Sequence, residues 1–103
     1  GLAAGADGAI GSTYNCMLTE FKEIYNTFLS GNYKKALELQ MEANRVISVM
    51  LNMGGGIIPA IKCTLELQGI DVGYATYPMK RYNEEEKKIL RQRLKEAGLK
   101  GLL

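Results

Sequence analysis

The chain has 103 residues, of which 47% are hydrophobic and 23% are charged, and its formal net charge is +2. This length allows one domain with a modest core, and the composition is typical of a folded globular protein rather than a disordered chain. The small net charge argues against binding to nucleic acid or to an anionic membrane, and no apolar run approaches the roughly 18 residues of a membrane span. The absence of histidine excludes Ser-His and Cys-His nucleophile pairs and imidazole metal sites, so we expect no metal site.

The first distinctive segment is GADGAIGSTYN at residues 5–15, in which small and apolar residues precede a pair of hydroxyl residues. This pattern predicts a short β-strand over residues 5–11 and the start of a helix at Asn15. A single strand has no partner to pair with in a chain that is otherwise helical. The N-terminus has no basic region and carries an acidic residue within its apolar stretch, so we do not expect a signal peptide. The first residue is not Met, which indicates a processed chain, a tag remnant or a fragment.

The first two predicted helices carry apolar side chains at spacings of three and four. One runs from Asn15 to Ser30-Gly31, where glycine can adopt the left-handed conformation that ends a helix. Asn32 is expected to cap the second helix, which extends over residues 33–53. The two stripes contain Met17, Leu18, Phe21, Ile24, Tyr25, Phe28 and Leu29 in the first helix, and Ala36, Leu37, Leu39, Gln40, Ala43, Val46, Ile47, Met50 and Leu51 in the second.

Three glycines, Gly54 to Gly56, predict a turn before two further helices. The third helix covers residues 57–69 and tolerates a proline in its first turn. An irregular, aromatic-rich connection follows at residues 70–82. Asn83 and three glutamates then predict a capped fourth helix that ends at Gly98. The inner face of that helix is expected to contain Ile89, Leu90, Leu94 and Ala97.

Several segments together resemble the N-acetylneuraminate lyases, which belong to the pyruvate-dependent class I aldolase superfamily with dihydrodipicolinate synthase. The strand ending in GSTYN resembles the eighth barrel strand of these enzymes, and IIPAIKCTLELQGI and NEEEKKILRQRLKEAGL resemble later helices in the same order. The resemblance covers essentially the whole chain. It implies a mainly α fragment with four helices: residues 1–31 form the last strand and helix of a (β/α)8 TIM-type barrel, and residues 32–103 form a C-terminal three-helix extension.

The resemblance also implies an activity, which is the retro-aldol cleavage of sialic acid to pyruvate and N-acetylmannosamine through a lysine Schiff base. In the family, the Schiff-base lysine and the tyrosine that transfers protons lie on strands that this chain lacks, so these 103 residues alone are expected to be inactive. No cofactor is expected. A dihydrodipicolinate synthase-type condensing enzyme remains an alternative, and so does a non-catalytic, self-associating helical module.

The expected partners are small molecules, namely pyruvate and an amino sugar in the full enzyme, together with further copies of the chain. Neither nucleic acid nor a membrane is expected as a partner. Cys16 and Cys63 match no metal or redox spacing, and we predict that both are buried, reduced thiols in a cytoplasmic protein.

The candidate site residues follow the predicted strand. Active sites of barrel enzymes lie at the carboxyl ends of the strands, so residues 11–13 would lie at the barrel mouth. By the resemblance, Ser12 contacts the substrate with Gly11 beside it, and Thr13 is a further candidate; the alternative is that Ser12 only caps the next helix. Met79, in the YPM connection, is a candidate contact for the sugar tail. Lys62 is the one lysine here that could imitate the nucleophile, although helical spacing places its ammonium group in solvent.

Overall fold

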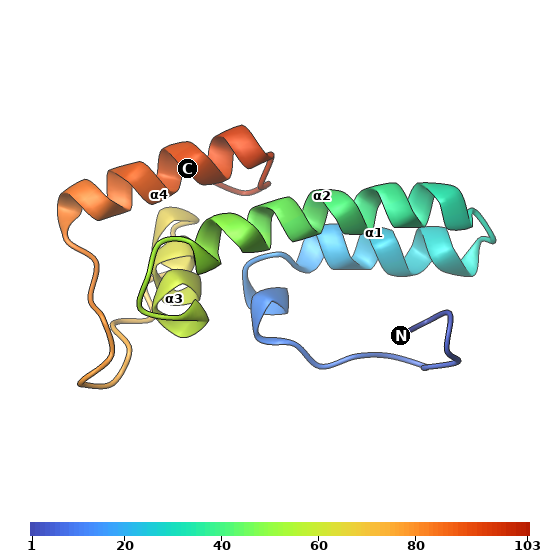
Figure 1. Ribbon diagram of the computed structural model, residues 1–103, viewed down its shortest axis with the longest axis horizontal. Helices are drawn as coiled ribbons and strands as arrows, with labels where there is room; N and C mark the ends of the chain where they lie inside the picture. The colour runs from blue at the N-terminus through green and yellow to red at the C-terminus, as the bar shows by residue number, and fades with distance from the viewer.

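The computed structural model describes all 103 residues, and its regular elements are one short 3-10 turn and four α-helices. The turn η1 covers Ser12–Asn15, and the helices are α1 (Leu18–Leu29), α2 (Tyr33–Leu51), α3 (Ile57–Leu67) and α4 (Glu84–Ala97). Helices α1 and α2 lie antiparallel, α3 crosses beneath the end of α2, and α4 packs over α2 and α3 (Figure 1). None of the helices combines the length and the apolar character that a bilayer span requires.

The predicted strand at residues 5–11 does not form. The segment runs as an open coil beneath α1, and the backbone at Gly11 is extended with φ −154° and ψ 141° (Figure 1). Residues 8–10 make no backbone hydrogen bond, and the Ile10 side chain is fully exposed. A strand is stabilised by N–H and C=O groups on a neighbouring strand, and every other regular element of this chain is helical.

The predicted helix boundaries are largely confirmed because they depend on local capping. The Asn32 side chain accepts a hydrogen bond from the Lys35 amide at 3.2 Å, and Asn83 forms a reciprocal capping box with Glu86. Gly98 closes α4 in the left-handed conformation with φ 92°. Helix α1 begins three residues later than predicted, at Leu18, because residues 12–15 wind into the tighter 3-10 turn instead.

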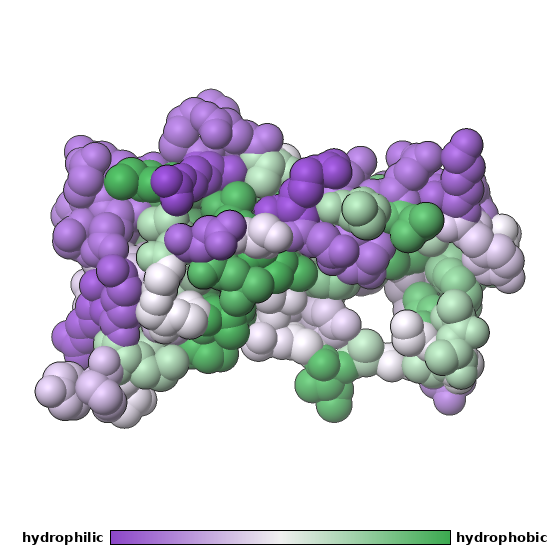
Figure 2. Space-filling view, viewed as in Figure 1, coloured by the Kyte–Doolittle hydropathy of each residue, from purple (hydrophilic) through white to green (hydrophobic).

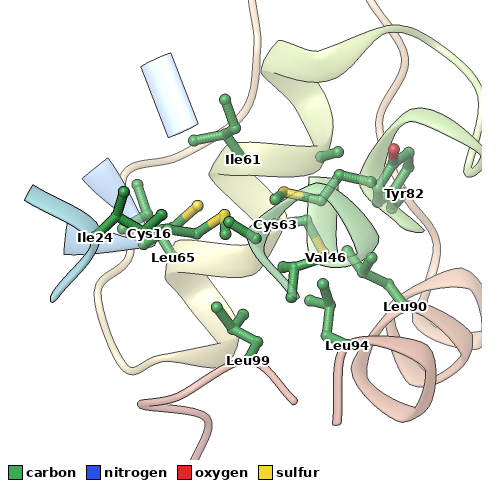
Figure 3. Packing of buried hydrophobic residues seen from close by; sticks show 14 of the residues in the cluster. Cys16, Ile24, Val46, Ile61, Cys63, Leu65, Tyr82, Leu90, Leu94 and Leu99 are labelled. Atoms are coloured by element: carbon green, nitrogen blue, oxygen red, sulfur yellow. The ribbon is translucent and has the colours of Figure 1, made fainter. Parts of the chain in front are cut away.

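The hydrophobic core lies where α2, α3 and α4 meet, with the residues after η1 inserted from the side (Figure 3). Met17, Met50, Leu90 and Leu94 are fully buried there. The predicted apolar stripes are wider than the buried surface because each helix packs against few neighbours. Large apolar side chains that the patterns assigned to the inner faces are in fact exposed: Leu18, Tyr25, Leu29, Leu37, Leu51 and Ile89.

The glycine turn between α2 and α3 holds the 70–82 connection in place. The Tyr82 hydroxyl donates to the Gly54 carbonyl at 3.1 Å. A Cβ atom at Gly55 would lie 2.5 Å from the Cβ of Lys80, so a residue without a side chain is required for this close approach. The connection at residues 70–82 therefore packs against the glycine turn that precedes α3.

The capping box of α4 predicts a pH-dependent contribution to stability. The hydrogen bond from Lys80, at 2.6 Å, and then that from the Asn83 amide lower the pKa of Glu86 from its ordinary value of 4.5. A carboxylate with a lowered folded-state pKa stabilises the fold above its unfolded pKa, and this contribution is lost as the pH falls through the folded-state pKa. We expect Glu86→Gln to lower the urea midpoint at neutral pH and to converge with the original chain as the pH falls from 4.5 through the lowered pKa of Glu86. A difference in midpoint that stays constant across this range would contradict the assignment.

Candidate functional site

The segment predicted to contact substrate forms a compact turn. The Tyr14 amide donates to the Gly11 carbonyl at 3.2 Å, and the Asn15 side-chain amide donates to the Ser12 carbonyl at 2.9 Å. The N-cap residue of α1 is Met17, and no side-chain hydrogen bond caps that helix. Ser12 therefore does not cap α1, and its exposed hydroxyl group is free to bond another molecule.

An aromatic ring lies close over Gly11, so a larger residue there would have to displace that ring slightly. A Cβ atom there would lie 3.0 Å from Cζ of Tyr14, whose ring packs on Phe21 with the centroids 4.3 Å apart. Thr13 contributes through its backbone, because its carbonyl accepts hydrogen bonds from the amides of Cys16 and Met17. These contacts hold the backbone on both sides of Ser12.

Gln68 anchors this turn to the rest of the molecule. Its side-chain amide donates to the Cys16 carbonyl at 2.8 Å and to the Lys100 carbonyl at 3.1 Å. One side chain after α3 thus links the turn to the C-terminal segment. The sequence patterns did not identify Gln68, because both of its acceptors are backbone atoms distant along the chain.

A cavity of about 250 Å³ lies beside Ser12, between the turn and α3. It is lined by Ser12, Asn15, Ile58, Ile61, Lys62, Leu65 and Val72. Met79 is not among the lining residues, so the structure brings Ser12 together with α3 rather than with the YPM connection. Ile58 and Val72 were not identified from the sequence, since an apolar residue at helical spacing is equally consistent with the core.

Two lysines near the cavity, Lys62 and Lys87, form hydrogen bonds to oxygen atoms. The Lys62 ammonium donates to the Tyr74 carbonyl at 3.4 Å. Lys87 lies 3.0 Å from Glu66 and 3.4 Å from Glu84, and these hydrogen bonds raise its pKa above the ordinary value of 10.5. A lysine that forms a Schiff base requires a lowered pKa. The carboxylates around Lys87 raise its pKa, so Lys87 is not suited to this role.

The two cysteines are free and buried, as predicted. Burial is the main cause that raises the pKa of both thiols, Cys16 and Cys63, to about 11. The thiolate is the reactive form, so neither cysteine is an effective nucleophile at neutral pH. The side chains of the chain form no cluster of cysteines and carboxylates suited to a metal ion.

Comparisons with known proteins agree on one family. The model of the dihydrodipicolinate synthetase family matches residues 1–97. An N-acetylneuraminate lyase of Clostridium perfringens (strain ATCC 13124) is 41% identical over 81 residues, which are 79% of this chain and 27% of the relative.

Two solved structures superpose on nearly the whole chain. The Proteus mirabilis N-acetylneuraminate lyase has a TM-score of 0.84 at 31% identity, over 96% of this chain and 33% of its own. The N-acetylneuraminate lyase (sialic acid aldolase) of Aliivibrio salmonicida has a TM-score of 0.83 at 28% identity, over 95% of this chain and 32% of its own. The chain thus spans between 27% and 33% of these relatives, and its four helices match the C-terminal part of such barrel enzymes.

Proposed function

Because this chain belongs to the dihydrodipicolinate synthetase family, we propose that it is the C-terminal portion of an N-acetylneuraminate lyase-like aldolase. In that enzyme, residues 1–31 supply the last strand and helix of the barrel, and residues 32–103 form the three-helix extension. The observation that carries this proposal is the 41% identity to a lyase of Clostridium perfringens, together with the match of all four helices to lyase structures. The lack of backbone hydrogen bonds at residues 8–10 supports it, because a barrel would supply strands on both sides of them.

The proposed reaction of the whole enzyme is the retro-aldol cleavage of sialic acid to pyruvate and N-acetylmannosamine. A lysine outside these residues forms the Schiff base with the keto carbonyl, and the carbon–carbon bond then breaks with the electrons delocalised into the iminium group. This chain contributes substrate contacts rather than the nucleophile. By itself it is inactive.

Ser12 is the proposed substrate contact at the barrel mouth. Its hydroxyl group is exposed and has no partner within the chain, and a hydroxyl can both donate to and accept from a sugar oxygen. Gly11 and Thr13 are the proposed neighbours that shape the turn. Met79 remains a proposed contact for the sugar tail on a separate wall, since it lies outside the cavity beside Ser12.

The exposed apolar surface around α1 is proposed to pack against the rest of the barrel. A groove of about 500 Å³ separates the N-terminal segment from α1, and most of its lining is hydrophobic, including Leu18 and Phe21. Without the barrel, this surface favours self-association of the isolated chain. The two free thiols are typical of a reducing compartment, which supports a cytoplasmic location.

Replacement of Ser12 tests this function in a full-length aldolase that contains these residues. We expect Ser12→Ala to lower kcat/KM for sialic acid about 3- to 10-fold, the equivalent of one hydrogen bond. Trapping of pyruvate by borohydride should be unchanged, because the Schiff base forms elsewhere. Ser48→Ala, an exposed serine on α2, is the matched control. Loss of pyruvate trapping in Ser12→Ala would show that Ser12 acts on pyruvate instead, and unchanged kinetics would remove it from the site.

A further inference from the structure

We propose that Gln68 is a positioning residue for the reaction of the whole enzyme, because its side-chain amide holds the turn that carries Ser12. Gln68 acts through the Cys16 carbonyl and the backbone of that turn, rather than through a bond of its own to the substrate. This inference rests on the proposed function, since it assigns the effect of Gln68 to the sugar contact made by Ser12.

The turn at residues 11–16 has one hydrogen bond to a distant part of the chain. The Gln68 side-chain amide donates to the Cys16 carbonyl at 2.8 Å, across 52 positions of sequence. The other hydrogen bonds of residues 11–16 all end within residues 11–17. Residues 8–10 make no backbone hydrogen bond, and Figure 2 shows an open gap between the N-terminal segment and α1. Gln68 is therefore the polar link between the turn and the helices that follow it.

The bond at Cys16 is close to Ser12 along the backbone. The amides of Cys16 and Met17 both donate to the carbonyl of Thr13, at 3.2 and 3.0 Å, and Thr13 directly follows Ser12. Cys16 is buried, so its carbonyl needs a partner from the protein, which Gln68 supplies. Loss of that partner would free the Cys16 peptide to move, and with it the Thr13 peptide and the Ser12 hydroxyl.

The chain after α4 holds the Gln68 side chain from its other side. The same amide donates to the Lys100 carbonyl at 3.1 Å. A Cβ atom at Gly101 would lie 3.5 Å from the Gln68 side-chain nitrogen, so the backbone there packs against this amide. The Leu103 amide donates to the Leu67 carbonyl at 3.1 Å, which joins the segment to the end of α3. A primary amide has two N–H groups, enough to serve both of its carbonyl acceptors.

Lys100 also joins this segment to α1. Its backbone amide donates to the Glu20 carboxylate at 3.0 Å, and its ammonium lies 3.2 Å from Glu23. The Lys100 and Glu23 side chains are both exposed, and an exposed ion pair of this kind contributes little. Gln68 is half-buried and makes two hydrogen bonds, so we assign the positioning role to Gln68 rather than to the ion pair.

The expected effect is confined to the sugar and requires the Ser12 hydroxyl. A hydrogen bond weakens steeply when its distance or angle departs from the preferred range, so a small displacement of Ser12 weakens its bond to the sugar. The proposed Schiff base forms on a lysine outside these residues, and its formation with pyruvate does not depend on this turn.

A double-mutant cycle in a full-length aldolase that contains these residues tests the positioning role. Gln68→Met removes both donated hydrogen bonds and keeps a side chain of similar length. We expect it to lower kcat/KM for sialic acid about 2- to 5-fold in the original enzyme, but less than about 1.5-fold when Ser12→Ala is already present. Trapping of pyruvate by borohydride should be unchanged. Gln92→Met is the matched control, because Gln92 donates only to Glu96 on the exposed side of α4.

The outcomes separate this inference from the proposed function. Equal losses with and without Ser12→Ala would overturn the positioning role, because Gln68 would then act independently of Ser12. A parallel loss of pyruvate trapping, or unchanged kinetics in Gln68→Met, would also overturn it. Failure of the original enzyme to trap pyruvate would instead overturn the proposed function. Circular dichroism shows whether Gln68→Met is folded, and Gln68→Glu, which keeps the shape of the side chain but has no N–H donor, provides the second test.

Discussion

Residues 1–103 incubated with pyruvate and borohydride should keep a mass of 11.4 kDa, whereas a full-length aldolase that contains them should gain one covalent pyruvate adduct. A Schiff base needs an unprotonated amine, which proteins supply by burying a lysine or placing it beside another cation. Lys87 lies between two carboxylates, Glu66 and Glu84, which favour the protonated form. Lys62 donates its ammonium hydrogen to a carbonyl group.

The trapping experiment has an internal control, because the full-length enzyme carries the same lysines. Peptide mapping of its adduct should locate the modification outside residues 1–103. A stoichiometric adduct on the isolated chain would identify a nucleophile in this part of the molecule. The variants Lys62→Arg and Lys87→Arg would then show which lysine carries it.

Leu94→Ala should destabilise the isolated chain by about 2–5 kcal/mol, the cost of deleting a fully buried leucine side chain and leaving a cavity. Leu94 projects from α4 into the core, near Val46 and Leu90 (Figure 3). A domain of this size has a total stability of about 5–15 kcal/mol, so the substitution removes a large share of it. Urea denaturation followed by circular dichroism measures the change.

Leu37→Ala is the matched control for Leu94→Ala. Leu37 is also a helical leucine, but its side chain is 62% exposed, so its removal should change the unfolding free energy by less than about 0.5 kcal/mol. Equal losses in the two variants would mean that self-association covers Leu37 in solution. Repeating the measurement at several protein concentrations distinguishes this case, because only an associated state has a stability that depends on concentration.

The four helices and most of their ends were predictable because their causes are local. Asn32 and Asn83 accept hydrogen bonds from amides three residues ahead, and Gly98 adopts a conformation that other residues avoid. Hydrophobic periodicity identified the buried Leu90 and Leu94 correctly. The same periodicity could not exclude Ile89, because a stripe records which side chains are apolar and not how many neighbours cover them.

The predicted strand at residues 5–11 does not form, because strand formation depends on a partner that a local sequence pattern does not report. Residues 5–11 have the composition of a strand, yet this chain contains no other strand with which they could pair. The resemblance to a lyase nevertheless followed from the same segment, since the order of residues in GSTYN does not depend on whether the strand is paired.

The sequence by itself determined the helices, their caps and the family, because these depend on residue types and on spacings of a few residues. Only the tertiary structure decided that Ser12 lines a cavity together with residues of α3, and that the Gln68 side chain bonds the backbone next to the turn. Ser12 and Ile58 are far apart in the chain, and Gln68 lies 52 positions from Cys16, whose carbonyl it binds. Contacts across such distances depend on how whole helices pack, which no local pattern specifies.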